Sequence, residues 1–293
     1  MDKIIYYNSS LPRAGSTLLQ NIIGQNPEIY VTPTSGLNDL ISVSRDTFSN
    51  SQSFKAQDPN LMSKAYINFC RYGIQGFFKS ITEKPYVLDK SRGWGIEYNL
   101  LEKIFPNPKV VCVVRDIRSI YSSMEKNFRK NPHKNSGIQD FNELIGTTLD
   151  KRIDNWGVSQ PIGISMDRLK DMIQQGIDKK TLFIRYEDLM SNPIEEIKRF
   201  YDYIGLEFYV KHNFENIEQL TQENDVIHGI FGDHKLRKEF KKLPDDYNEI
   251  LGVEISQKIK DHYQNHLWDC EVMQCVAATI YGLLKTSTDA GAE

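Results

Sequence analysis

The sequence predicts an α/β protein in which a parallel β-sheet carries helices on both faces. Each predicted strand is followed by a segment that can form a helix, and this alternation is typical of parallel crossover connections. The apolar, β-rich runs that predict the strands are residues 3–8, 86–88, 109–114 and 181–186. The 293 residues are 40% hydrophobic, enough for a large core, and no segment has the composition of an interdomain linker. We therefore expect one domain over residues 1–284 and a flexible tail over 285–293.

The first predicted strand leads through a turn-like segment into the first predicted helix. Residues 4–7 are β-rich, residues 9–15 are turn-like, and the apolar positions between Leu18 and Ile23 are spaced as one helical face. The free N–H groups of such a loop point at whatever lies above the helix terminus. A terminus of this kind suits an anion.

This loop does not match the Walker pattern of nucleoside triphosphatases, G-x-x-x-x-G-K followed by Ser or Thr. Ser10 and Ser16 replace the first Gly and the Lys, so that only Gly15 and Thr17 fit. What remains is a cradle of amides and hydroxyls, with the Arg13 guanidinium able to bind a phosphate or a departing oxyanion through two N–H groups. An ordinary capped strand-to-helix turn is the alternative interpretation.

A second candidate anion site follows the strand predicted at 109–114. Arg115 stands at the carboxyl end of that strand, where ligands of open α/β sheets bind, and Ser123 lies two turns into the next predicted helix. Asp116 supplies the chemistry of a helix start. The alternative is that Arg115 and Arg118 merely pair with acids such as Asp116.

The remaining chain predicts helices and an irregular cover. Residues 58–80 and 136–178 have mainly helical character, and residues 254–284 end the domain as a helix. Residues 207–245 are polar and predict an irregular segment over the edge of the sheet.

Four segments together resemble the sulfotransferases that use 3′-phosphoadenosine 5′-phosphosulfate (PAPS). Residues 12–17 are similar to that family's 5′-phosphosulfate loop, in the Arg-containing form of the tyrosylprotein and many bacterial enzymes. Arg115 and Ser123 resemble its 3′-phosphate site, and residues 184–189 resemble its Tyr-Glu-Asp segment. Residues 228–237 resemble the late loop that closes over the nucleotide.

The resemblance implies a P-loop-type three-layer sandwich with a central parallel sheet flanked by helices. It implies transfer of a sulfuryl group from PAPS to a hydroxyl or amine by in-line displacement, with adenosine 3′,5′-bisphosphate (PAP) as the product and with no metal required. Tyr186 would lie near the adenine, and Arg237 would be a further ligand of the 3′-phosphate. The donor-binding residues that it implies are Arg13, Ala14, Gly15, Ser16, Thr17, Arg115, Ser123, Tyr186 and Arg237.

Catalysis of such a transfer needs placement and fixed positive charge more than covalent chemistry. Arg13 and Lys90 can stabilise charge on the leaving phosphate or on the sulfuryl oxygens. Lys90 follows the strand predicted at 86–88 and matches the position of a catalytic Lys in related sulfotransferases. A solvated loop lysine is the alternative for Lys90.

The general base is harder to assign from the sequence. In the tyrosylprotein enzymes a Glu lies shortly after the first helix, but the matching place here, residues 31–35, contains no acid. The candidates are Asp39, Glu97, Asp225 and His228, and His228 has the most suitable unperturbed pKa. We therefore predict His228 as the third catalytic residue, beside Lys90 and Arg13.

Two other functions fit parts of the pattern. One is a P-loop phosphotransferase that uses ATP and Mg²⁺, against which the missing Lys after Gly15 speaks. The other is a module that binds adenosine bisphosphate without catalysing a transfer.

Composition limits the partners and the compartment. A net charge of −3 excludes a polyanion binder that works by bulk charge, so we expect no nucleic acid partner. Four cysteines without a CxxC pair indicate a reducing compartment and no metal site. No apolar run approaches the length of a membrane span, and we expect a cytoplasmic protein. The acceptor stays open among carbohydrate, lipid, small metabolite and peptide, because variable loops and insertions build acceptor pockets.

Overall fold

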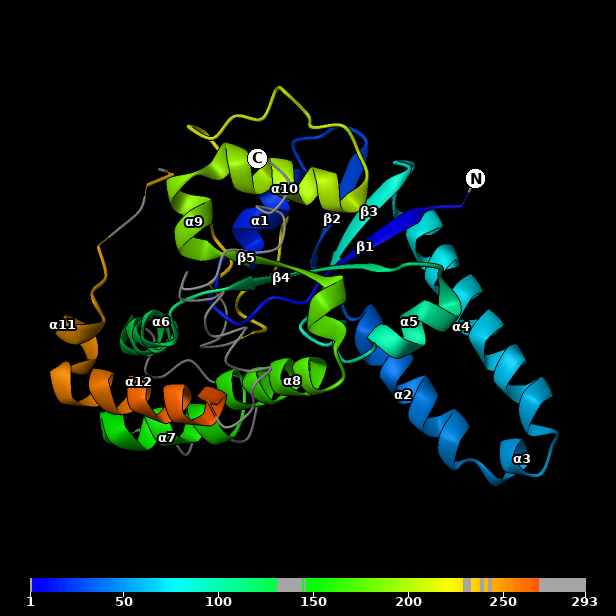
Figure 1. The fold of residues 1–293 in the computed structure, drawn as a ribbon, viewed down its shortest axis with the longest axis horizontal. Coiled ribbons are helices and arrows are strands. Elements are labelled where there is room, and N and C mark those ends of the chain that lie inside the picture. The colour runs from blue at the N-terminus through cyan, green and yellow to red at the C-terminus, as the bar shows by residue number, and fades with distance from the viewer. Residues whose placement is uncertain are drawn as a thin grey trace, which may run out of the picture.

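A central five-stranded parallel sheet organises the chain (Figure 1). The computed structural model describes residues 2–130, 144, 146–228, 233–237, 240, 241 and 244–268, with side chains up to Tyr263. The strand order is β2-β3-β1-β4-β5, and every neighbouring pair is parallel. The strands are β1 (Ile4–Asn8), β2 (Ile29–Thr34), β3 (Tyr86–Lys90), β4 (Lys109–Val114) and β5 (Thr181–Arg185). The predicted fold class, a three-layer sandwich around a parallel sheet, is confirmed.

Helices connect the strands and cover both faces of the sheet. The first half of the chain contains α1 (Ser16–Ile23), α2 (Leu37–Asn50), α3 (Gln52–Lys55), α4 (Pro59–Ile81) and α5 (Tyr98–Ile104). The second half contains α6 (Ile117–Lys130), α7 (Leu149–Val158), α8 (Ile162–Gln174), η2 (Ile177–Lys180), α9 (Tyr186–Ser191), α10 (Pro193–Ile204), α11 (Tyr247–Leu251) and α12 (Val253–Trp268). Figure 1 shows α1 and α10 on one side of the strands, with α5 and α8 on the other.

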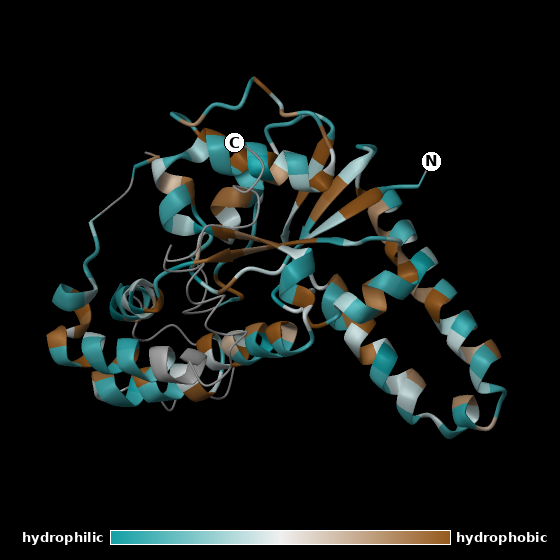
Figure 2. Cartoon of the chain, viewed as in Figure 1, coloured by the Kyte–Doolittle hydropathy of each residue, from teal (hydrophilic) through white to brown (hydrophobic). Residues whose placement is uncertain are grey.

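The sheet divides the core into two clusters because successive side chains of a strand point to opposite faces. Tyr6 and Leu88 pack with α1, whereas Tyr7 and Val87 pack with α2, α4 and α5. Figure 2 shows brown, apolar stretches along the strands, with paler and teal residues between them. Since both faces of the sheet are covered, the interior strand β4 has the continuous apolar run, Val110–Val114, that is typical of a buried parallel strand.

Strand β2 is the element that the sequence analysis did not predict. It contains Pro33, which lacks a backbone N–H, and it lies at the edge of the sheet, where that donor is not needed. Its last residue, Thr34, pairs in register with Lys90 at the end of β3. The end of this unpredicted strand therefore lies beside Lys90, at the edge of the sheet where the carboxyl ends of the strands meet.

The other predicted segments agree with the structure where it describes them. Helix α4 covers the region predicted at 58–80, and α7 and α8 lie within 136–178. The described residues between 207 and 245 contain neither helix nor strand. Helix α12 covers the first part of the segment that is predicted as helix at 254–284. The rest of that predicted segment, from residue 269, and the tail predicted at 285–293 lie outside the described residues.

Two further expectations concern compartment and thiols. None of the helices in the described part of the chain is long and apolar enough to cross a membrane. Cys70 and Cys112 are buried free thiols, and Cys270 and Cys275 lie outside the described residues.

Candidate active site

A pocket of about 250 Å³ opens where the carboxyl ends of β1, β3 and β4 meet. Its walls come from the loop after β1, the end of β3, the middle of α6, helix α9, and the late segment between residues 217 and 241. The residues of the sequence prediction that line it are Arg13, Gly15, Ser16, Thr17, Lys90, Arg115, Ser123, Tyr186, His228 and Arg237. Ala14 is the exception, because its side chain is fully buried in the core beneath the loop. The structure thus gathers segments that are far apart in sequence into one site.

The loop after β1 has a backbone that few residues tolerate. Gly15 has φ +101°, and a Cβ there would lie 2.7 Å from Cδ2 of Tyr186. Arg13 also adopts a positive φ of 55°, which is uncommon for a residue with a side chain. Ser9 and Leu11 fix the start of the loop by donating their N–H groups to β4 carbonyls. The loop is therefore held in one strained shape, as functional loops often are.

The loop ends at a helix N-terminus that favours an anion. The N-cap residue of α1 is Gly15, which offers no capping side chain, and the first turn of the helix contains no acid. Ser16 and Thr17, in that first turn, line the pocket. The exposed N–H groups of a first turn carry partial positive charge, so this end of the pocket suits a phosphate or sulfate.

Arg13 lies across the pocket and makes contacts to two distant elements. Its Nε donates to Oγ of Ser123 in α6 at 3.0 Å. Its Nη1 and Nη2 donate to the carbonyl and to Oδ2 of Asp233, at 2.9 and 3.0 Å. Arg13 and Ser123, which the sequence assigned to different phosphates of the donor, are thus in contact, and a carboxylate from the late segment occupies the anion-binding side of the guanidinium.

The Arg115 guanidinium packs against the Tyr186 ring, and one of its N–H groups is not used in a hydrogen bond to the described residues. Its Nη1 donates to the carbonyl of Arg13 at 3.2 Å, and its guanidinium lies 4.4 Å from the centre of the Tyr186 ring. Its Nε is buried and has no hydrogen-bond partner among the described residues. Asp116 is bound by Arg118 instead. A buried guanidinium with an unused N–H next to an aromatic ring fits a nucleotide phosphate and base, and its burial lowers the pKa of Arg115.

Lys90 and Glu223 form a buried ion pair at the base of the pocket. Lys90 Nζ lies 3.0 Å from Glu223 Oε1 and 3.3 Å from Oγ1 of Thr17, and the two charged side chains are 7% and 4% exposed. Burial lowers the pKa of Lys90, although Glu223 opposes that effect. Burial alone would raise the pKa of Glu223, but Lys90 and the N–H of Thr34 outweigh it and hold that pKa at about 2. Lys90 is therefore not a solvated loop lysine.

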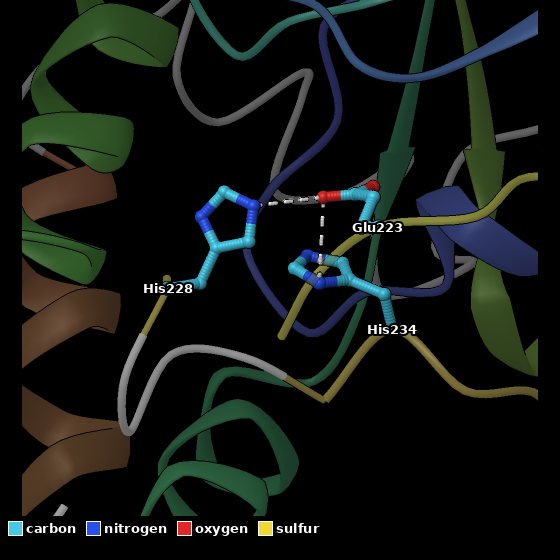
Figure 3. Close-up of side chains that lie close together, drawn as sticks. All are labelled: Glu223, His228 and His234. Atoms are coloured by element: carbon cyan, nitrogen blue, oxygen red, sulfur yellow. Dashed lines mark ion pairs between the residues drawn. The ribbon is translucent and has the colours of Figure 1, made fainter. Parts of the chain in front are cut away.

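Two histidines lie close to Oε2 of Glu223, the carboxylate oxygen that Lys90 does not contact (Figure 3). His228 Nε2 and His234 Nδ1 lie 3.2 and 3.5 Å from Glu223 Oε2. His234 Nδ1 also lies 2.8 Å from Asp225 Oδ1, and burial lowers the pKa of His234. The histidine predicted as a base is thus part of a charged cluster that reaches Lys90 through Glu223.

The ligand atoms of Glu223, His228 and His234 lie within 4.8 Å of one another, as metal ligands do. The Lys90 ammonium on the same carboxylate opposes a second cation at this place. The expectation that no metal is required stays a prediction.

The other candidate bases do not line the pocket. Glu97 is buried and bound by Arg45 and Ser42. Asp39 is exposed on α2, and Asp225 is engaged with His234. Among the four candidates, the pocket geometry favours His228.

Glu223 and Asp233 are the site residues that sequence reasoning missed. Their contacts to Thr34 and Arg13 span 189 and 220 residues of sequence. Only the composition of the sequence could have indicated them. Residues 223–234 are rich in acids and histidines and lack the periodicity of a helix or a strand.

The fold and the pocket together define an α/β protein that binds an anionic ligand at the carboxyl edge of its parallel sheet. The sequence pattern of the Sulfotransferase family matches residues 9–209, more than half of the chain. The chain belongs to this family and is a sulfotransferase. No curated protein matches it.

Solved structures support the fold. The sulfotransferase domain from the curacin biosynthetic pathway is 17% identical, with a TM-score of 0.55; the match covers 90% of this chain and 98% of that one. The mouse sulfotransferase SULT7A1, crystallised with PAP, is 14% identical, with a TM-score of 0.55, and the match covers 96% of this chain and 90% of that one. Both are similar to this chain in architecture.

Proposed function

We propose that this sulfotransferase moves a sulfuryl group from PAPS to a hydroxyl or amine acceptor without a metal. The observation that carries the proposal is the convergence of Arg13, Lys90 and Arg115 with the N-terminus of α1 in one pocket. A structure of the mouse sulfotransferase SULT7A1 in complex with PAP, which matches over most of this chain, is consistent with this donor. When bound, PAPS supplies an electrophilic sulfur and a phosphate leaving group.

The residues at the loop divide the work of donor binding. Gly15, Ser16 and Thr17 offer amides and hydroxyls to the 5′-phosphosulfate, and the backbone of Ala14 shapes the turn. Arg115, Ser123 and Arg237 hold the 3′-phosphate. Tyr186, packed on Gly15 and Arg115, provides a flat surface for the adenine.

Lys90 and Arg13 carry the electrostatic part of catalysis. Lys90 Nζ lies beside Thr17 of the anion-binding turn, where it can stabilise charge that develops on the leaving phosphate. Arg13, whose guanidinium lies beside Ser123 and Asp233, is the second cation that we assign to this role. His228, partly exposed at the pocket wall, accepts the acceptor's proton.

Three wider assignments accompany this function. We propose that residues 1–284 act as one domain and that the protein works in the cytoplasm. The acceptor is a carbohydrate, lipid, small metabolite or peptide.

Calorimetric titration with PAP, and separately with ATP and Mg²⁺, tests the donor. We expect PAP to bind at micromolar concentration or tighter and ATP with Mg²⁺ to bind far more weakly. Arg115→Ala removes a charge-assisted contact worth about 1.5–3 kcal/mol, so PAP affinity should fall roughly 10- to 150-fold. Arg118→Ala is the matched control, because that Arg binds Asp116 and does not line the pocket. ATP binding without PAP binding would favour the phosphotransferase, and PAP binding without turnover of PAPS would favour a non-catalytic module.

A further inference from the structure

The side chains drawn in Figure 3 differ in exposure. The His228 side chain is 39% exposed and lines the pocket, whereas Glu223 behind it is 4% exposed. Lys90, 7% exposed, binds the other oxygen of that carboxylate and itself lines the pocket. An acceptor that enters the pocket therefore meets His228 before it meets the carboxylate.

The two oxygens of Glu223 have different environments. Oε1 accepts from the N–H and the hydroxyl of Thr34, at 2.8 and 3.0 Å, and from Lys90 at 3.0 Å. Oε2 is buried, has no well-aligned hydrogen bond among the described residues, and faces the two histidines. The strong contacts at Oε1 fix the carboxylate, so Oε2 is presented to His228 in a defined direction.

The charge of Glu223 decides which nitrogen of His228 carries the proton. An ionised carboxylate only accepts hydrogen bonds, so the nitrogen that faces it must donate. That nitrogen is Nε2 of His228, and Nδ1 is then the bare, basic nitrogen. His234 does not compete for this role, because its Nδ1 lies closer to Asp225 than to Glu223.

We propose that Glu223 is a positioning residue that holds His228 as the Nε2–H tautomer, leaving Nδ1 to take the proton of the acceptor. This inference rests on the proposed function. In the step, the O–H or N–H bond of the acceptor breaks, its electron pair stays on the attacking atom, and a new N–H bond forms at Nδ1. Glu223 then lies between the imidazolium of His228 and the ammonium of Lys90, and it stabilises the positive charge that appears on the histidine.

Glu223→Gln tests this role in the full-length protein. The variant removes the charge that fixes the tautomer and keeps the size of the side chain. We expect nitrogen NMR of labelled histidine, with the His228 signal assigned through His228→Gln, to give one Nε2–H tautomer in the wild type and a mixture in Glu223→Gln. We expect kcat with PAPS to fall about 100-fold, within the usual contribution of a general base.

Donor binding separates this role from a purely structural one. Because Glu223→Gln frees Lys90 from its counter-ion, PAP should bind with equal or higher affinity in calorimetry. Glu218→Gln, an exposed change in the same late segment, is the control and should alter neither signal. If Glu223→Gln does not fold, Glu223→Asp keeps the charge and withdraws it from His228, and the same loss of tautomer and of kcat is expected.

The outcomes are distinguishable from failure of the proposed function. An unchanged His228 tautomer in the variant would overturn the positioning role, and so would a loss of PAP binding in proportion to the loss of kcat. A wild-type protein that binds PAP but transfers nothing from PAPS would overturn the proposed function and, with it, the proton transfer to His228. In that case the single Nε2–H tautomer would still establish the contact between Glu223 and His228.

Discussion

Replacing Asp233 by Asn should strengthen the binding of PAP, although Asp233 lies inside the proposed donor site. Its carboxylate is bound by the Arg13 guanidinium, on the side where an anionic donor group would bind. A bound phosphate therefore has to displace Asp233 or tolerate its negative charge. The substitution retains the backbone carbonyl that accepts from Arg13 Nη1, so the loop contact survives while the competing charge is removed.

The magnitude follows from the exposure of this ion pair. The Arg13 and Asp233 side chains are 19% and 35% exposed, so the pair belongs with partly solvated ion pairs worth about 0.2–1 kcal/mol. At room temperature that range corresponds to a factor of about 1.4 to 5 in the dissociation constant. We expect the upper half of that range at low ionic strength, with a smaller effect at high salt because solvent ions screen exposed charges.

Calorimetric titration of PAP into the wild type and Asp233→Asn, each at two salt concentrations, measures this difference. Asp2→Asn is the control, because Asp2 forms a more exposed ion pair with Lys79 and does not line the pocket. Weaker binding of PAP by Asp233→Asn would refute the reasoning, since it would mean that the carboxylate helps to build the donor site.

Three further predictions concern the buried charges. Lys90→Ala should lower kcat with PAPS about 10²- to 10³-fold while changing PAP affinity little, as measured by steady-state kinetics and calorimetry; unchanged turnover would remove Lys90 from the mechanism. Burial raises the pKa of Asp89 to about 6, from an unfolded value of 3.8, so its carboxyl favours folding below about pH 4 and loses that contribution as the pH rises through 6. Asp89→Asn should therefore be more stable than the wild type at pH 7, by up to about 3 kcal/mol in urea unfolding, with the difference vanishing below pH 4; equal pH profiles would contradict this. Dialysis against EDTA should leave turnover unchanged and metal analysis of the protein should find no stoichiometric ion, whereas activity restored only by added Zn²⁺ would assign Glu223, His228 and His234 to a metal.

The parallel fold was predictable because its strands are buried on both faces and have continuous apolar runs. This pattern is clearest in β1 and β4, whereas β3 has a shorter apolar run before Asp89 and Lys90, and β5 is apolar but only partly buried at the edge of the sheet. β2 was missed because an edge strand tolerates Pro33 and polar residues such as Thr32 and Thr34. Its place in the sheet depends on pairing with β3, which no local pattern of residues 29–34 encodes.

The cationic half of the site was predictable for a related reason. Arg13, Lys90 and Arg115 each lie at or just beyond the carboxyl end of an apolar strand, and the ends of parallel strands meet at one edge of a sheet. The anionic half was not predictable, because Glu223 and Asp233 lie in a segment with no regular structure. Only tertiary packing brings that segment to β2 and to the loop after β1.

The cationic and anionic residues form two ion pairs, Arg13 with Asp233 and Lys90 with Glu223. The two ion pairs differ in exposure to solvent, and we assign them different roles for that reason. Arg13 and Asp233 are partly solvated, so an anionic ligand can exchange with Asp233 at little cost. Lys90 and Glu223 are buried and Thr34 adds two hydrogen bonds to the carboxylate, so removing Glu223 from Lys90 would leave a buried charge unpaired. A bound donor should therefore replace Asp233 and leave Glu223 in place beside Lys90 and His228. It follows that Asp233→Asn should act on donor affinity and Glu223→Gln on turnover, and a reversal of the two effects would show that Glu223 is the group that the donor displaces.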